Sequence, residues 1–239
     1  MSEVEGVRIT KGSMDFMREN RLYMDTEGSV IEQKVLQSGA GISCMCLQGN
    51  EVHSRSYPSS FRGNHQMGGY EVIESMRLRE MAPRLASEVV QLHKATLCPS
   101  EKMDLIIGKS QLVLQVHESC GHAVELDRVL GYEANFAGTS FLTLDKWKNF
   151  KYGSAKVNLY QDGRTPEAIG SAKYDDEGVP CTNTELVRDG QFVGYLKSRD
   201  SAIFENGLSN GAARAQGWKN VPIVRMTNIH LAPGNETLD

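Results

Sequence analysis

Two histidines five positions apart, His117 and His122, place the tightest restriction on how this chain can fold locally. Glu118 lies beside the first of them, so the segment has the pattern H-E-x-x-x-H. Two imidazoles can hold a zinc ion, and a carboxylate next to them can accept a proton from water. On a regular α-helix, positions i and i+4 lie roughly 40° apart around the axis, whereas i and i+5 lie roughly 140° apart. A regular helix would therefore separate the two rings too widely for a shared metal.

A local π turn removes this difficulty, because its i→i+5 hydrogen bonds return the two positions to one face of the helix. Gly121 directly precedes the second histidine, and glycine relaxes the backbone restriction at that point. We therefore predict a helix over about residues 110–129 that is widened or bent near residues 120–121. It is expected to end before Gly131, which suits a helix C-terminus.

A catalytic zinc site usually has three protein ligands, and spacing alone supplies no convincing third one. Glu125 lies three positions after His122 and can either approach a metal or remain a solvated helix residue. Cys120 and Asp127 are also near in the sequence, whereas Cys181 is distant. The alternative interpretation is that the two histidines are ordinary core or surface residues that are neighbours by chance.

The remaining polar clusters are interpreted as structural. His93 ends a predicted helix, and His53 and His65 belong to a strand and a loop, so none of the three is taken as a ligand. The acidic run at residues 175–177 precedes a glycine and a proline, which favours a turn over an acidic metal site.

The first sixty residues predict a meander of antiparallel strands. Turn-type clusters separate four candidate strands and occupy residues 26–28, 38–40 and 48–50. The hydrophobic period then changes over residues 69–95, where Leu85, Val89 and Leu92 recur as on one face of a helix. Pro83 is expected in the first turn of that helix.

Residues 103–107 are predicted to form a short strand before the second helix, and strands return after Gly131. Asp189 and Gly190 stand between two apolar runs, which is a strong signal for a two-residue hairpin turn. The predicted fold class is α+β, with an antiparallel strand meander, two longer helices at about 69–95 and 110–129 packed against sheet, and a second strand-rich region.

We expect one α+β unit over residues 1–239. A candidate sub-boundary near residues 98–102 would separate the strand meander and first helix (1–98) from the metal helix and the strand-rich C-terminal region (103–239).

Composition excludes several classes of protein. A net charge of −4 gives no reason to expect nucleic-acid binding, which requires a basic patch. The N-terminus lacks the basic start and apolar core of a secretory signal, and no apolar stretch approaches the ~20 residues of a membrane span. The five cysteines include no C-x-x-C pair and fit buried, reduced thiols. We therefore predict a cytoplasmic protein without a nucleic-acid or membrane partner.

The segment from His117 to Gly131 resembles the metal-binding helix of the TldD/PmbA metalloprotease family. Similar segments occur in order along the chain: Glu-Gly-Ser at 27–29, Arg-Ser-Tyr-Pro at 55–58, Phe-Ala-Gly-Thr-Ser-Phe-Leu at 136–142, Tyr-Asp-Asp-Glu-Gly-Val-Pro at 174–180, Gly-Tyr-Leu-Lys-Ser-Arg at 194–199 and Arg-Met-Thr-Asn at 225–228. The collinear similarity extends from about Gly6 to Gly234. Within the family the chain resembles the TldD-like subunit, because the PmbA-like (TldE) partner lacks the metal motif.

The resemblance implies a zinc-dependent peptidase that acts on small or unfolded polypeptides. His117 and His122 match the two histidine ligands of the family, and Glu118 matches its catalytic glutamate. The third family ligand is a cysteine near the C-terminal end, which is expected beyond Asp239, so the chain is expected to be a fragment of a longer protein. The resemblance also implies a homo-oligomer or a hetero-oligomer with a related subunit.

Two alternatives stay open at this point. The first is a non-catalytic scaffold or partner subunit, which is inactive because the third ligand is absent from this chain. The second is a metal-dependent hydrolase of another bond, such as a small amide or ester.

Overall fold

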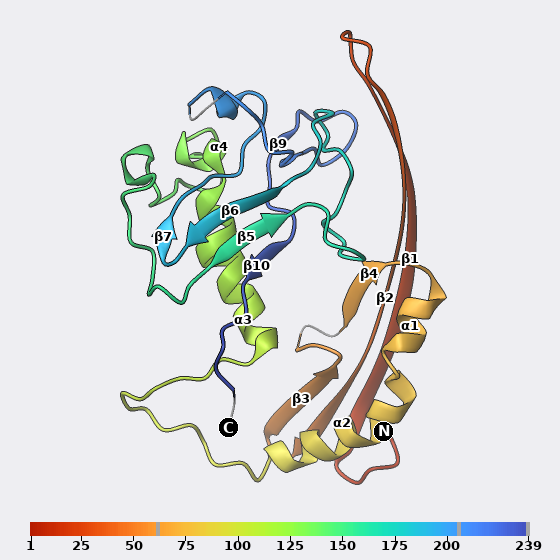
Figure 1. The fold of residues 1–239 in the computed structure, drawn as a ribbon. Coiled ribbons are helices and arrows are strands. Elements are labelled where there is room, and N and C mark those ends of the chain that lie inside the picture. The colour runs from red at the N-terminus through yellow and green to blue at the C-terminus, as the bar shows by residue number, and fades with distance from the viewer. Residues whose placement is uncertain (61–62, 205–206, 238–239) are drawn as a thin grey trace. The chain divides into compact units, whose positions relative to one another are not determined.

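The computed structural model describes residues 1–60, 63–204 and 207–237 (Figure 1). By its internal contacts the chain separates into two compact units. The first comprises residues 1–19 and 34–112, and the second comprises residues 20–33 and 113–239. The expected single α+β unit with a sub-boundary near residues 98–102 remains a prediction, because compactness does not test which parts fold independently.

A four-stranded antiparallel sheet contains the N-terminal strands. Its members are β1 (Val7–Met24), β2 (Val30–Gln48), β3 (Glu51–Tyr57) and β4 (Asn64–Met67). The order is β1-β2-β3, and β4 also pairs with β2. The turns predicted at residues 26–28 and 48–50 are present between strands, and the two long strands β1 and β2 are conspicuous in Figure 1.

The turn predicted at residues 38–40 is wrong, because β2 continues through them and pairs with β4 there. Gly39 lies opposite His65 in that register. A Cβ at Gly39 would fall 2.1 Å from the His65 ring, so the small residue makes room for a cross-strand neighbour. Glycine at position 39 therefore serves close packing between two strands, although glycine is also a residue type that favours turns.

The helix predicted over residues 69–95 is two helices, α1 (Tyr70–Ser75) and α2 (Leu78–Leu92). They are separated at Arg77, whose φ of 51° is left-handed and cannot continue an α-helix. Pro83 lies inside α2 instead of in its first turn. Leu85 and Val89 of α2 are buried against Cys44 and Cys46 of β2, as expected for two strand residues that share one face.

The strand predicted at residues 103–107 is also wrong, because this segment has no regular structure. Its residues Leu105 and Ile106 are largely exposed. An isolated apolar run lacks the backbone partners that a strand needs, and no described strand pairs with it.

The C-terminal unit contains two further antiparallel sheets, which confirm the second strand-rich region. In the larger sheet the strand order is β10-β5-β6-β7, and its members are β5 (Leu159–Asp162), β6 (Asn183–Arg188), β7 (Gln191–Phe192) and β10 (Ile229–Leu231). The smaller sheet pairs β8 (Ala213–Arg214) with β9 (Ile223–Val224). The predicted hairpin turn is confirmed, since Asp189 and Gly190 both have positive φ, 49° and 76°.

The helix predicted over residues 110–129 is interrupted at Glu125. It begins as α3 (Lys109–Val116) and continues as a π turn (His117–Gly121) and a 3₁₀ turn (His122–Val124). Glu125 has an extended ψ of 111° and bridges to Leu196, and the chain then forms α4 (Leu126–Val129). The widening predicted near residues 120–121 is therefore confirmed, and Gly131 follows with a φ of 83°. The α+β class with antiparallel sheets is likewise confirmed.

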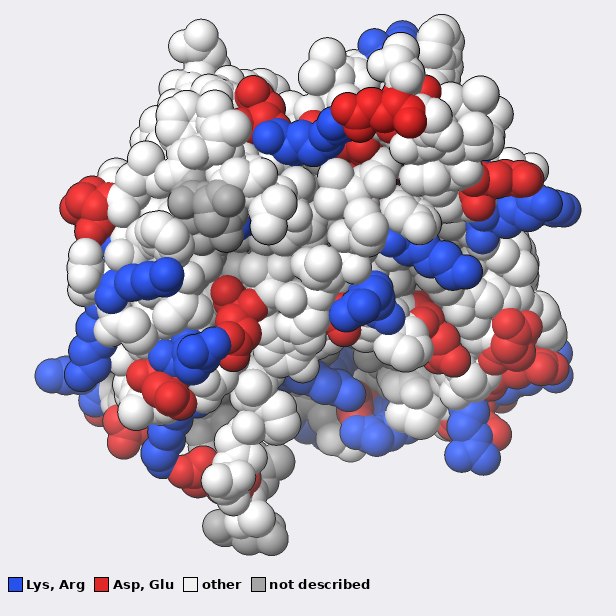
Figure 2. Space-filling model, turned by 45° about the horizontal axis from the view of Figure 1, so that its top comes forward, with Lys and Arg blue, Asp and Glu red and all other residues white. Residues whose placement is uncertain are grey.

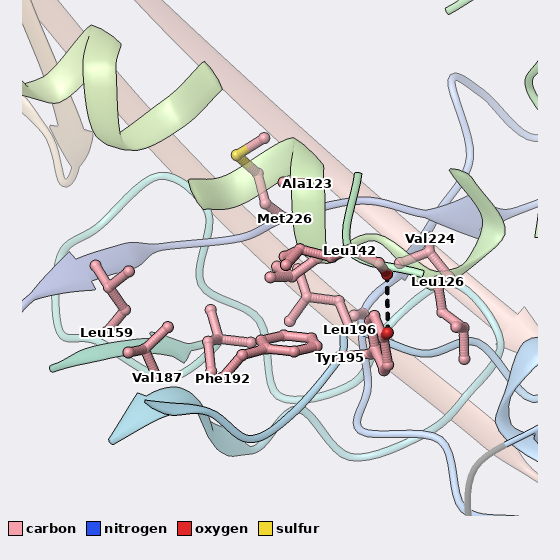
Figure 3. Packing of buried hydrophobic residues seen from close by; sticks show 13 residues of the cluster. Ala123, Leu126, Leu142, Leu159, Val187, Phe192, Tyr195, Leu196, Val224 and Met226 are labelled. Atoms are coloured by element: carbon pink, nitrogen blue, oxygen red, sulfur yellow. Dashed lines mark hydrogen bonds between the residues drawn. The ribbon is translucent and has the colours of Figure 1, made fainter. Parts of the chain in front are cut away.

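The main core of the C-terminal unit packs against the distal half of this helical segment (Figure 3). Val124 and Leu126 meet Phe192, Tyr195 and other side chains from the loops and the larger sheet. The Tyr195 hydroxyl donates a hydrogen bond to the backbone oxygen of Leu142 at 2.8 Å, which satisfies a polar group inside the apolar core. The core therefore holds the segment that contains His122.

Two surface properties bear on the expected partners. Among the described residues, no helix combines the length and apolarity needed to cross a bilayer. On the face shown in Figure 2, Lys and Arg side chains are interspersed with Asp and Glu.

Candidate metal centre

The π turn brings the two predicted histidines together. The backbone N–H of His122 donates to the backbone oxygen of His117, which is the i→i+5 bond of a π turn. The two ring centroids lie 4.7 Å apart with an interplanar angle of 88°. One potential ligand atom each from His117, Glu118 and His122 fall within 4.8 Å of one another. The structure thus gathers all three predicted site residues.

The structure gives Gly121 a role that differs from the expected one. Its φ and ψ, −68° and −59°, are ordinary helical values that any residue adopts. A Cβ at this position would instead lie 2.5 Å from the sulfur of Met226. Glycine therefore allows the Met226 side chain to approach the turn closely, and backbone freedom is not its role.

Replacing Gly121 with alanine tests this reason by the sign of its effect. If glycine only relaxed the backbone, Gly121→Ala would stabilise the helix by roughly 0.5–1 kcal/mol. We expect a net destabilisation instead, because overpacking costs about 1–3 kcal/mol. Denaturant unfolding of the parent and the variant measures the difference. In a Met226→Ala background the penalty is expected to disappear, and an undiminished penalty there would contradict the packing explanation.

His122 is oriented by a buried carboxylate. Glu125 is fully buried, and its Oε2 lies 2.9 Å from Nδ1 of His122. This contact occupies Nδ1 and leaves Nε2 of the same ring as the free ligand atom. Metal-binding histidines usually bond a carboxylate or carbonyl through their other ring nitrogen in this way. The sequence left open whether Glu125 approaches a metal or is solvated, and the structure shows neither: it is a positioning residue behind His122.

Both carboxylate oxygens of Glu125 accept further hydrogen bonds. Its Oε1 accepts the backbone N–H of Met226 at 3.1 Å, and its Oε2 accepts hydrogen bonds from Arg128 at 3.2 and 3.3 Å. Arg225 lies 3.9 Å from the same oxygen and forms a two-pronged pair with Glu133 at 2.7 and 2.8 Å. Hydrogen bonding by Arg225 holds the pKa of Glu133 below its usual value. The carboxylates of Glu125 and Glu133 are therefore each paired with an arginine.

The other candidate third ligands are engaged elsewhere. Cys120 accepts a hydrogen bond from the Tyr152 hydroxyl at 3.2 Å, and burial raises the pKa of its thiol. Asp127 is buried, and its Oδ2 accepts the Val224 N–H at 2.7 Å. Burial raises the pKa of Cys181 to about 12, which disfavours the thiolate that binds metals. Within the described part of the chain, none of these joins the His117, Glu118 and His122 group.

The acidic run at residues 175–177 is a turn, as predicted. One oxygen of Asp175 accepts the backbone N–H groups of Glu177 and Val179 at 3.0 and 2.9 Å. Its other oxygen accepts the Ala213 N–H at 3.0 Å. These hydrogen bonds stabilise the turn, so the Asp175 carboxylate has a structural role.

The site combines a rigid buried half with an accessible half. The His122 side chain is 27% exposed, whereas His117 and Glu118 are 48% and 63% exposed. Nε2 of His117 lies 4.0 Å from Oε1 of Glu118. The donor set of two imidazoles, one of them with an occupied Nδ1, fits a zinc ion, and the exposed carboxylate can meet water.

Sequence reasoning missed the residues that support His122. These residues are Arg128, Glu133, Arg225 and Met226. The last two stand more than a hundred positions after His122, and only the shared order of family-like segments pointed to them. The three-residue spacing from His122 to Glu125 was visible in the sequence. Spacing alone does not predict which ring nitrogen of His122 the Glu125 carboxylate contacts.

The fold is mixed α/β with antiparallel sheets, and it presents an H-E-x-x-x-H segment on a π turn. Residues 100–239 match the model of the PmbA/TldA metallopeptidase C-terminal domain. A metalloprotease of Methanocaldococcus jannaschii is 32% identical over 216 residues, which cover 90% of this chain and 44% of that protein. The chain belongs to the TldD/PmbA family, as its motifs predicted.

A more distant relative and two solved structures are also similar to this chain, and the solved structures share its fold. A Saccharolobus solfataricus protein named a zinc metalloprotease TldD homolog is 22% identical over 72% of this chain and 36% of its own length. A candidate modulator of a DNA gyrase from Thermotoga maritima has the same fold, with a TM-score of 0.79, 19% identity and coverage of 99% of this chain and 50% of that one. TldE from Thermococcus kodakarensis gives a TM-score of 0.70 and 17% identity over 95% of this chain and 48% of its own. The chain spans about half the length of the curated relatives it matches.

Proposed function

We propose that this chain provides the metal-binding helix of a zinc-dependent metallopeptidase that hydrolyses peptide bonds of small or unfolded polypeptides. One observation carries the proposal: the π turn directs the rings of His117 and His122 together, and Glu125 occupies Nδ1 of His122 so that its Nε2 is free. The family relationship supports a metal-dependent peptidase, and the name of one relative supports zinc.

In this proposal His117 and His122 would hold the zinc ion, which when bound would supply Lewis acidity to the scissile carbonyl and to the attacking water. Glu118 accepts the proton of that water and later delivers it to the leaving amine. Its 63% exposure lets the carboxylate reach both positions without crossing the buried core. Glu125 and Arg128 keep the His122 ring in place during both proton transfers.

We further propose that the active protein is an oligomer of this subunit or a complex with a related subunit. The structural likeness to TldE supports such an assembly. The alternative of a non-catalytic scaffold is less favoured, because a purely structural metal site has no use for the exposed carboxylate of Glu118.

The proposal is tested by metal content and peptide cleavage together. The parent chain and a His117→Gln/His122→Gln variant are dialysed against zinc and then against metal-free buffer, and bound zinc is measured. We expect the variant to lose one equivalent of zinc and all cleavage of an unfolded polypeptide. Unchanged zinc content together with unchanged cleavage would exclude this site. Each protein is assayed alone and with a related subunit.

A further inference from the structure

A second group of metal-type side chains lies in the N-terminal unit, among residues that the sequence suggested were structural. Glu51 and His53 are two positions apart on β3, so their side chains lie on the same face of the strand. His93 caps the C-terminal end of α2, which packs on this hairpin. One potential ligand atom from each of the three lies within 4.8 Å of the other two.

The contacts centre on one carboxylate oxygen. Oε2 of Glu51 lies 3.2 Å from Nδ1 of His93 and 3.7 Å from Nε2 of His53. The two imidazoles face each other edge to face, with ring centroids 5.8 Å apart and an interplanar angle of 70°. A single oxygen facing two imidazole nitrogens is the arrangement of a monodentate carboxylate among histidine ligands.

The two nitrogens are buried and lack hydrogen bonds. Nε2 of His53 and Nδ1 of His93 are inaccessible to solvent, and neither has a hydrogen-bond partner among the described residues. The 3.2 Å contact to Glu51 is close, but it does not have the direction of a hydrogen bond. Buried polar atoms are nearly always satisfied, so this pair requires an explanation. A cation between the three side chains would satisfy both lone pairs at once.

We propose that Glu51, His53 and His93 form a second divalent-metal site, which joins the C-terminal end of α2 to the β2–β3 hairpin. Two imidazoles and one carboxylate suit zinc and related first-row metals better than magnesium or calcium. Around a tetrahedral zinc with bonds of about 2.0–2.1 Å, neighbouring ligand atoms stand roughly 3.3–3.4 Å apart, close to the two distances observed. Glu51 is 67% exposed, so the carboxylate of the group can be reached from solvent.

The chemistry of this site differs from that of the first. Here the carboxylate is itself a ligand, whereas Glu118 is an additional carboxylate beside a histidine pair. The metal joins a helix end to a hairpin, which indicates a stabilising role. Unfolding would separate residues 51 and 93 and release the metal, so zinc is expected to raise the thermal stability of the protein.

The experiment uses the full chain in which the first site is disabled by His117→Gln/His122→Gln. After dialysis against zinc and then metal-free buffer, we expect this variant to retain one equivalent of zinc. Adding His93→Gln is expected to remove that equivalent, as is adding Glu51→Gln, which alters an exposed side chain and leaves the core intact. His65→Gln is the matched control: this histidine of β4 pairs with Asp15 and is expected to leave zinc content unchanged.

Thermal unfolding provides the second measurement. Zinc is expected to raise the melting temperature of the His117→Gln/His122→Gln variant and to have no effect once Glu51→Gln is added. Cobalt(II) replaces zinc as a visible probe, and its absorption band is expected to vanish with the same substitution. A variant that keeps no zinc after dialysis, or keeps it regardless of Glu51 and His93, would overturn the second site. Either result leaves the first site to be judged on its own test.

Discussion

Glu118→Gln is expected to lower the turnover number for peptide cleavage by about 10²–10⁴-fold, the contribution typical of a positioned general base. Glutamine has nearly the same shape as glutamate but cannot accept the proton of the attacking water. Glu118 is 63% exposed and is not one of the two histidine ligands, so zinc content and stability are expected to remain at parent values. Steady-state kinetics on an unfolded polypeptide and metal analysis measure the two effects separately.

A matched control distinguishes catalysis from a general effect of charge. Glu101 is an exposed glutamate in an irregular segment, and Glu101→Gln changes the net charge by the same amount. It is expected to cleave at the parent rate. If Glu118→Gln also cleaved at the parent rate while holding its zinc, Glu118 would not be the base, and the proposed mechanism would fail.

Glu125→Gln is expected to weaken both the metal site and the fold. Hydrogen bonds to charged groups contribute about 1.5–3 kcal/mol each, and removing one partner of a buried ion pair costs about 3–5 kcal/mol. Glu125 is fully buried between His122 and Arg128, so a loss of this order in the free energy of unfolding is expected. Residues that orient a metal-binding histidine typically account for 10–100-fold in metal affinity, and we expect zinc affinity to fall by about that factor.

Glu133→Gln separates the two effects. Glu133 is also nearly buried and pairs with an arginine, but it bonds Arg225 instead of His122. We expect this control to lower stability while zinc affinity stays close to that of the parent. Chemical unfolding and competition titration with a zinc chelator provide the measurements. Equal losses of zinc affinity in both variants would show that general destabilisation, and not the orientation of His122, explains the Glu125 result.

The local geometry of the candidate site could be predicted from sequence because it depends on neighbouring residues. The five-residue spacing of His117 and His122 admits a shared metal only with a widened turn, and the structure contains that turn. The hairpin at Asp189 and Gly190 was equally predictable, since positive φ at both positions favours these residue types.

Predictions failed where a residue type suits two environments. Glycine at position 39 suggested a turn, but it serves a strand that needs room for His65. Glycine at position 121 was expected to free the backbone, but it makes room for Met226. The histidines at 53 and 93 were assigned structural roles one at a time, because their common neighbour Glu51 becomes visible only when strand and helix are packed.

The sequence by itself determined the family, the antiparallel α+β class and the turn that pairs the two histidines, because each depends on short-range pattern or on the order of motifs. Only the tertiary structure decided which groups hold those side chains in place. Glu125 bonds the backbone of Met226 across 101 positions, and no periodicity encodes a contact over that separation. Such contacts arise when distant segments pack together and their buried polar atoms must find partners.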